Sequence, residues 1–226
     1  MISVLELSKS FGNHQVLKRI NLTFEPGSIY GIVGENGSGK TTLFRCIAGL
    51  ESYAGTIQSP YPVLKDHTGF LPTNPEYLSR ITGWEFLKLV CIARGIREEA
   101  FEEQNIFDLP LDQYADTYST GMKKKLALMG ILLQQNDLFI LDEPFNGVDI
   151  HSNMIILELI RKLQSLKKTV LISSHIFATL QESCDFIYLL QDGQIAKSVA
   201  PDQFGELEAQ MKSFVVGDRI NRIRIG

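Results

Sequence analysis

Cysteine is scarce in this sequence and widely scattered. Its three cysteines among 226 residues are Cys46, Cys91 and Cys184. They form no Cys-x-x-Cys pair and no cluster with histidine, which argues against a disulfide framework and against a cysteine-based metal site. Each has apolar neighbours, so we expect three buried thiols in a reducing compartment.

Long apolar runs and an excess of positive charge are missing as well. The longest apolar runs, such as residues 127–133, fall well short of the roughly 18 residues that cross a membrane. Residues 1–7 alternate like a β-strand and lack the basic and then apolar layout of a signal peptide. The formal net charge of −4 offers no basic face for nucleic acid. We therefore expect a cytoplasmic protein that binds no nucleic acid.

Two kinds of apolar pattern predict the fold class. Polar and apolar residues alternate at 20–24, close to turn signals, which is typical of antiparallel strands. Continuous apolar runs at 29–33, 138–141 and 169–172 indicate buried strands, and a helical apolar spacing at 156–166 separates the last two. Strand, helix and strand in this order favour a parallel sheet. We predict an α/β fold with a mainly parallel, helix-covered sheet and an N-terminal antiparallel β subdomain.

Three further segments complete the predicted organisation. Residues 186–196 are typical of a hairpin that turns at Asp192-Gly193. We interpret residues 75–118 as a small, helix-rich subdomain inserted in the α/β domain. The main domain is placed at 1–200, and the charged, weakly patterned tail at 201–226 is left without a predicted structure.

A glycine-rich segment follows the first buried strand and precedes a predicted helix at 40–50. It matches Gly-x-x-x-x-Gly-Lys-[Ser/Thr], the P-loop pattern, in which glycines let backbone N–H groups approach a phosphate. The positive end of the following helix favours the same anion. We expect Lys40 to reach the β- and γ-phosphates and the Thr41 hydroxyl to ligate Mg²⁺. The predicted nucleotide-binding residues here are Gly34, Glu35, Asn36, Gly37, Ser38, Gly39, Lys40, Thr41 and Thr42.

Acidic and histidine side chains end the other two buried strands. Asp142 and Glu143 directly follow one apolar run, at the carboxyl end where ligands bind in open α/β sheets. Asp142 is predicted to hold Mg²⁺ with Thr41, and Glu143 to polarise an attacking water. His175 closes the other run and is predicted to hydrogen-bond the γ-phosphate. Lys40, Glu143 and His175 are therefore the predicted catalytic residues.

A second anion-binding element is predicted at the start of another helix. In Tyr118-Ser119-Thr120-Gly121-Met122 the serine is a plausible N-cap, and Lys123-Lys124-Lys125 follows. Cations in a first helical turn oppose the helix macrodipole by about 0.3–1 kcal/mol each, and a docked anion would remove this conflict. Together with the P-loop and the acidic strand end, this segment resembles the ABC ATPase family, whose signature is usually Leu-Ser-Gly-Gly-Gln. The resemblance covers about residues 3–197.

The resemblance implies roles for further residues. Phe11 would either stack on the adenine of ATP, as the family's aromatic residue near the N-terminus does, or be a core residue. Ser119 and Gly121 would contact the γ-phosphate held by a second subunit. Asp149 would be the acidic member of the loop that links the two ATP sites.

One position departs from the family. Where the family usually has a glutamine that contacts Mg²⁺ and the water and reports to the membrane partner, this chain has Thr73 followed by Asn74. We predict that Thr73 or Asn74 takes this role at the metal, with altered coupling or slower turnover.

The resemblance also implies partners. A second ATPase subunit, identical or related, would sandwich two ATP molecules with this one. Separate integral membrane transporter subunits would place the chain on the cytoplasmic face of the cell membrane. Trp84 is either an anchor for these subunits or, in the interpretation we favour, a core residue of the helical insert. The form of the signature and the short insert resemble bacterial export-type subunits.

The resemblance implies a subunit that binds and hydrolyses ATP to power transport through the membrane subunits by closure of the ATPase dimer. Two other functions are also compatible with the motifs. One is a soluble ABC-type ATPase that acts on nucleic acid or ribosomes, although residues 42–118 are too few for the long coiled coil of chromosome-maintenance members. Translation-associated members carry two ATPase halves, whereas this chain carries one. The other is a non-hydrolysing regulatory ATP-binding module, for which Thr73 is the only support. GTPases fit poorly because no Asn-Lys-x-Asp segment occurs.

Overall fold

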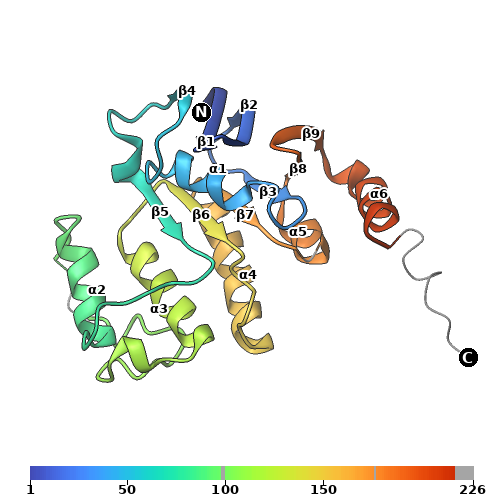
Figure 1. The fold of residues 1–226 in the computed structure, drawn as a ribbon. Coiled ribbons are helices and arrows are strands. Elements are labelled where there is room, and N and C mark those ends of the chain that lie inside the picture. Colours follow the sequence, from blue (N-terminus) through green and yellow to red (C-terminus); the bar gives the residue numbers. More distant parts are fainter. Residues whose placement is uncertain (98–99, 176, 217–226) are drawn as a thin grey trace, which may run out of the picture.

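An antiparallel sheet forms the N-terminal part of the molecule. The computed structural model describes residues 1–97, 100–175 and 177–216 (Figure 1). The smaller of its two sheets has the strand order β2-β1-β4, with both pairings antiparallel. Its strands are β1 Ile2–Phe11, β2 His14–Phe24 and β4 Ala54–Gln58. The predicted antiparallel β subdomain is confirmed.

The larger sheet is parallel except at one edge. Its strand order is β5-β6-β7-β3-β8-β9, and only the β8–β9 pairing is antiparallel. At the predicted hairpin turn, Asp192 and Gly193 have φ values of 50° and 77°, which suit a tight turn between antiparallel strands. The strands are β3 Ile29–Val33, β5 Thr68–Leu71, β6 Leu138–Asp142, β7 Thr169–Ser173, β8 Phe186–Gln191 and β9 Gln194–Val199.

Both faces of the larger sheet are covered, which explains the continuous apolar runs of its strands. Along β6, Leu138 and Ile140 pack into the core shared with α1 and the antiparallel sheet. Phe139 and Leu141 pack on the opposite side, into the core shared with α3, α4 and α5. Successive side chains of a strand point to opposite faces, so a strand that is buried on both sides needs apolar residues at every position.

The helices lie on both faces and in a separate lower part of the molecule (Figure 1). They are α1 Lys40–Ile47, α2 Gly83–Ile92, α3 Thr120–Leu133, α4 Ile150–Ser165, α5 Phe177–Ser183 and α6 Phe204–Val216. Three short 3₁₀ helices are η1 Leu64–His67, η2 Ala115–Thr117 and η3 Pro201–Gln203. All three cysteines are buried thiols, as predicted.

The insert at 75–118 contains less helix than predicted. Among its described residues only α2 and η2 are helical, and the rest forms mainly turns and irregular segments. The turns still bury apolar side chains, including Phe101 and Phe107, so tertiary packing and not helical periodicity places them. Trp84 is half-buried and packs edge-on against Phe101, which favours its interpretation as a core residue.

The C-terminal segment is helical where it is described. η3 and α6 occupy residues 201–216, a segment for which the sequence offered no prediction. Residues 217–226 of the tail lie outside the described residues. The division into a main domain at 1–200 and a tail stays a prediction. Within the described chain, no helix combines the length and apolar character that a membrane crossing requires.

Candidate active site

The predicted phosphate loop connects the central strand β3 to α1. A Cβ atom on Gly34 would lie 2.2 Å from the carbonyl oxygen of Leu190, too close for any side chain. Gly39 has φ 107°, a conformation that other residues rarely adopt, and a Cβ there would lie 2.9 Å from Leu17. These two glycines let the loop turn sharply from a buried strand into the N-terminus of α1. Backbone N–H groups and the helix end then face the same anion site.

Lys40 lies within the loop and is buried. Its Nζ donates to the carbonyl oxygens of Gly34 at 2.8 Å and Glu35 at 3.0 Å. Burial lowers the pKa of Lys40, and the carboxylates of Glu143 and Asp142 act in the opposite direction. A phosphate group would offer this ammonium charged acceptors, which form stronger hydrogen bonds than carbonyls do.

Asp142, at the end of β6, accepts three hydrogen bonds from hydroxyl groups. Thr41 and Thr73 each donate to its Oδ2 at 2.7 Å, and Ser173 donates to its Oδ1 at 2.5 Å. The aspartate is 1% exposed, and Asp142 is paired with Ser173 of β7 in the sheet register. Strand β6, strand β7, the start of α1 and the segment after β5 therefore converge on one carboxylate.

This arrangement fits a magnesium ion. Carboxylate and hydroxyl oxygens are hard donors, and Mg²⁺ is usually bound by one or two carboxylates together with substrate phosphates and water. Among the described residues, no group of three or more His, Cys, Asp and Glu side chains is suited to hold a metal, so a cation here would depend on the threonine hydroxyls and on the nucleotide. Thr73 points at the candidate metal site, whereas Asn74 is exposed.

Glu143 and His175 form the second polar pair at this end of the sheet. The Glu143 Oε2 lies 2.7 Å from the Nδ1 of His175 and 3.3 Å from its backbone N–H, which donates to it. The Glu143 side chain is 13% exposed and that of His175 is 52% exposed. Glu143 has φ 53°, in the left-handed region, which costs a non-glycine residue about 1–3 kcal/mol and persists where surrounding contacts impose it.

One cavity of about 680 Å³ unites these groups. Residues of the phosphate loop and residues at or just after the ends of β6 and β7 line it. Val16 also lines this cavity, although no sequence pattern pointed to it. The residues that line it are Val16, Asn36, Gly37, Gly39, Lys40, Thr41, Thr42, Thr73, Asp142, Glu143, Asn146 and His175.

Three of the predicted loop residues, Gly34, Glu35 and Ser38, do not line this cavity. They line a second cavity of about 340 Å³, together with Asn36, Gly37 and parts of β2, the β8–β9 turn and α6. The Ser38 hydroxyl is buried and has no hydrogen-bond partner among the described residues.

Comparisons with known proteins agree with this geometry. Residues 17–146 match the sequence profile of the ABC transporter family. The chain belongs to the ABC transporter family of ATP-binding proteins.

Three relatives of this ABC subunit illustrate the similarity. It is 30% identical to the ABC-type transporter ATP-binding protein EcsA of Bacillus subtilis (strain 168), over 93% of both chains. It is 28% identical to the bacitracin transport ATP-binding protein BcrA of Enterococcus faecalis, over 96% of this chain and 75% of the relative. A solved ATP-binding subunit of an ABC transporter superposes with a TM-score of 0.85 at 26% identity, covering 94% of this chain and 99% of that one. The chain therefore has the P-loop α/β fold and is an ABC ATPase.

The residues predicted to act across an ABC dimer lie outside the 680 Å³ cavity. Ser119 is exposed and caps α3, accepting a hydrogen bond from the Met122 N–H at 3.2 Å. Gly121 packs so closely on the loop after β6 that a Cβ would lie 2.7 Å from the Gly147 carbonyl oxygen. Asp149 caps α4, and the hydrogen bond from the Ser152 N–H is the main cause of its lowered pKa.

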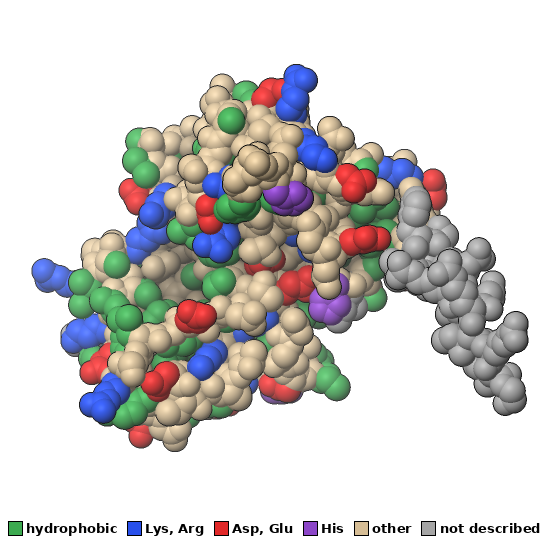
Figure 2. All heavy atoms as spheres, in the orientation of Figure 1, with side chains coloured by type: hydrophobic (Ala, Val, Ile, Leu, Met, Phe, Trp, Pro, Cys, Tyr) green, Lys and Arg blue, Asp and Glu red, His purple; other side chains and the backbone are tan. Residues whose placement is uncertain are grey.

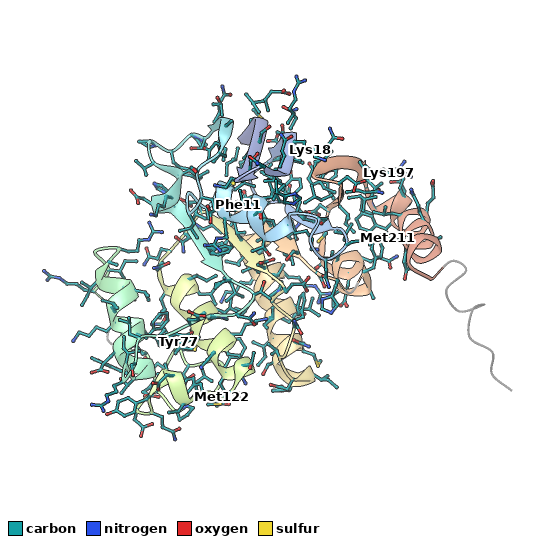
Figure 3. All side chains as sticks on the ribbon, viewed as in Figure 1. Phe11, Lys18, Tyr77, Met122, Lys197 and Met211 are labelled. Carbon is teal, nitrogen blue, oxygen red and sulfur yellow. The ribbon has the colours of Figure 1, made fainter. Side chains whose placement is uncertain are left out.

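Phe11 also lies outside both cavities. It is 48% exposed at the end of β1, and the Lys9 Nζ lies 4.7 Å from the centre of its ring. Figure 3 places Phe11 in the upper part of the molecule and Met122, the last signature residue, in the lower part. One ring face of Phe11 contacts the cation, and its adenine-stacking role stays a prediction.

Sequence reasoning assigned no role to Ser173 and did not distinguish Lys124 from the lysines beside it. Ser173 donates to Asp142 and accepts a hydrogen bond from the Glu143 N–H at 3.0 Å. The sequence signal that could have identified Ser173 is a serine at the end of the apolar strand that follows the strand ending in Asp142. In the sequence, Lys124 was one of three lysines in a helix start that was predicted to receive an anion; in the structure it is 1% exposed and donates to backbone carbonyls. This position of α3 faces the protein interior, and the anion-binding role of the helix start stays a prediction.

Proposed function

We propose that this ABC subunit hydrolyses ATP as its Mg²⁺ complex in a closed pair of subunits, and that hydrolysis drives transport through separate membrane subunits. One observation carries the proposal. The hydroxyl-bonded Asp142, the Glu143–His175 pair and Lys40 all open into the same cavity beside the phosphate loop. Phosphoryl transfer needs charge stabilisation, a positioned base and a phosphate cradle in one place.

The chemistry assigned to these side chains is a hydrolysis. The oxygen of a water molecule bonds to the γ-phosphorus while the bond from that phosphorus to the β,γ-bridging oxygen breaks, so that ADP and phosphate leave. Glu143 accepts the proton of the water, a contribution of about 10²–10⁴-fold for a positioned base. His175 orients the Glu143 carboxylate through their 2.7 Å contact. Thr41, Thr73 and Asp142 would hold Mg²⁺, which when bound neutralises charge that develops on the phosphates.

The need for two subunits follows from the position of the signature. Ser119 and Gly121 do not line the cavity of their own chain, although the N-terminus of α3 is a favourable place for an anion. A second ATPase subunit, identical or related, would bring its cavity to this helix end. Each ATP would then lie between the phosphate loop of one subunit and the signature of the other.

A path to membrane subunits begins at Thr73. This residue bonds to Asp142, and the chain then runs through Leu78, which is 69% exposed, to the N-cap of α2 at Thr82. Figure 2 shows hydrophobic side chains gathered over the lower left of the molecule, where Figure 1 places α2. A membrane partner that packs on this surface would sense a displacement of Thr73. The chain would then lie on the cytoplasmic face of the cell membrane.

The proposed export direction rests on the form of the signature and the short insert. Among the relatives, one is named a bacitracin transport protein and another, of Streptococcus pyogenes and 29% identical, a lantibiotic transport protein. A manganese transport relative from Halalkalibacterium halodurans is equally similar, so the cargo is left open in this proposal. On the face of the molecule shown in Figure 2, basic and acidic side chains are interspersed, so this face does not favour the alternative that acts on nucleic acid or ribosomes.

Replacing Glu143 by glutamine tests the hydrolytic function. Glu143→Gln keeps the shape and the contact to His175 but cannot accept a proton, so the steady-state ATPase rate should fall by roughly 10²–10⁴-fold. The variant should accumulate as an ATP-bound dimer in size-exclusion chromatography. Glu158→Gln, which changes an exposed residue of α4 paired with Arg161, is the matched control and should keep the wild-type rate.

An unaltered rate in Glu143→Gln would reject Glu143 as the base. No ATPase activity in the unmodified protein together with firm ATP binding would favour the non-hydrolysing regulatory module. The transport part of the proposal predicts that an integral membrane protein co-purifies with the tagged chain from solubilised membranes.

A further inference from the structure

Lys124 is a buried cation with an unusual pair of acceptors. Its Nζ donates to the carbonyl oxygen of Glu143 at 2.7 Å and to that of Asn146 at 2.7 Å, and the residue is 1% exposed. Burying an ammonium costs several kcal/mol, so its position calls for a compensating interaction. Both acceptors belong to the turn that follows β6. A basic residue of the signature helix α3 thus holds the backbone of the catalytic turn.

The same turn contains the strained residue of the active site. Glu143 has φ 53°, and its backbone N–H donates to the hydroxyl of Ser173 at 3.0 Å. Its carbonyl oxygen accepts from Lys124 and, at 3.2 Å, from the Asn146 N–H. Ser173 therefore fixes one side of the Glu143 backbone and Lys124 fixes the other. The direction of the Glu143 carboxylate depends on both.

The contact also joins two functional elements of one chain. Lys124 follows Ser119 and Gly121 in the first turns of α3, and Gly121 itself packs on Gly147. Lys125, the next residue, reaches Asp149 at 3.4 Å. The start of α3 and the turn after β6 are therefore one packed unit, so a displacement of the signature changes the support of Glu143.

We propose that Lys124 is a positioning residue for Glu143 that transmits engagement of the signature by one ATP to the base acting on the other ATP. The inference rests on the proposed function, because it assumes that Glu143 is the base and that the signature meets the nucleotide of a second subunit. In this proposal a single buried side chain links the two ATP sites of the dimer. Lys124 itself touches neither nucleotide nor water in this scheme.

Lys124→Met and Lys124→Gln test the link in the full-length chain. Methionine fills the space without donating a hydrogen bond, whereas glutamine keeps one N–H donor group for the carbonyls. The kcat for ATP should fall about tenfold or more in the methionine variant and less in the glutamine variant, since hydrogen bonds from charged donors are worth about one to two factors of ten. The KM for ATP should change less than about twofold, because the cavity lining is untouched.

The matched control is Lys168→Met. Lys168 precedes β7 at the opposite end of the sheet and pairs with Asp137 at 2.7 Å, so its removal should leave kcat unchanged. Amide hydrogen exchange is a readout that does not require ATPase activity. Exchange at residues 143–146 should accelerate about tenfold in Lys124→Met, and exchange at residues 34–42 should not change.

Several outcomes would overturn the proposal. These are a kcat within twofold of the wild type in folded Lys124→Met, a fall in kcat matched by an equal loss of ATP affinity, or unchanged exchange at residues 143–146. Failure of both variants to fold would also overturn it, since Lys124 would then be a structural link only. A wild-type chain that hydrolyses no ATP would contradict the proposed function instead, and the exchange experiment would still decide whether Lys124 holds the turn.

Discussion

The two ends of strand β6 each carry an aspartate, and their surroundings differ sharply. Asp137, just before the strand, pairs with Lys168 at 2.7 Å and with His67 at 2.9 Å, and its side chain is 32% exposed. Asp142, the last residue of the strand, is 1% exposed, and its carboxylate accepts hydrogen bonds from the hydroxyl groups of Thr41, Thr73 and Ser173. No salt bridge joins it to a cation of the described chain.

The difference distinguishes a carboxylate whose charge the chain itself compensates from one that we propose to hold a cation. Burial raises the pKa of Asp137, but hydrogen bonds from Lys168 and His67 outweigh it, and the net pKa lies below the ordinary value. Its charge is thus compensated by the chain itself. A buried carboxylate that is bonded by neutral donors keeps its charge available for an external cation, at a cost in stability. Ligands of open α/β sheets bind at the carboxyl ends of parallel strands, so a buried carboxylate that destabilises the fold can bind a ligand there.

Matched substitutions of the two aspartates should have very different effects on the ATPase rate. Asp142→Asn removes the charge at the candidate magnesium site, and the Mg²⁺-dependent ATPase rate should fall by roughly 10²–10³-fold, as when a strong electrostatic contact is lost from a transition state. Asp137→Asn should change the rate less than twofold. Steady-state assays across a Mg²⁺ titration measure both. Equal losses in the two variants would remove the distinction drawn between the two ends of β6.

Substitutions of Thr73 test the same candidate magnesium site, with a smaller expected effect. Thr73→Val keeps the shape and removes the hydroxyl that donates to Asp142 Oδ2, so the Mg²⁺ concentration for half-maximal activity should rise by about three- to tenfold. Thr73→Gln restores the residue usual in the family and should raise the ATPase rate or the coupling to transport. If the rate and transport both stay unaltered in Thr73→Gln, Thr73 does not take the role of the family glutamine.

The smallest expected effect concerns stability and pH. Because the pKa of Asp137 is lowered on folding, its ion pairs stabilise the folded chain above the unfolded pKa of about 4, and this contribution is lost as the pH falls through the folded pKa. Asp137→Asn should therefore lower the Tm at pH 7 by about 1–4 °C, since partly exposed pairs contribute up to about 1 kcal/mol. The difference from the wild type should shrink below about pH 4 in thermal scans. A difference that persists there would show that the charge of Asp137 is not its cause.

Local sequence patterns predicted much of the fold and the phosphate-loop part of the candidate site. The apolar runs at 29–33, 138–141 and 169–172 correspond to β3, β6 and β7, because strands that are buried on both faces have continuous apolar sequences. The P-loop residues are contiguous, so their spacing was readable directly. The insert at 75–118 was harder, because its turns bury Phe101 and Phe107 without any period.

Contacts between distant segments were not readable from the sequence. Ser173 lies beside Asp142 only because β6 and β7 pair in register. Thr73 was suspected from the family pattern, but only the structure brings it, and not Asn74, to the carboxylate.

The order of strands, glycines and acidic residues along the chain determined that this protein has a P-loop α/β core, since short-range sterics and burial act on neighbouring residues. Which side chains hold Glu143 and Asp142 in place was decided by tertiary structure alone. Lys124 shows why: three adjacent lysines look alike in the sequence, and only the packing of α3 turns one of them into the interior, where burial makes its two hydrogen bonds necessary.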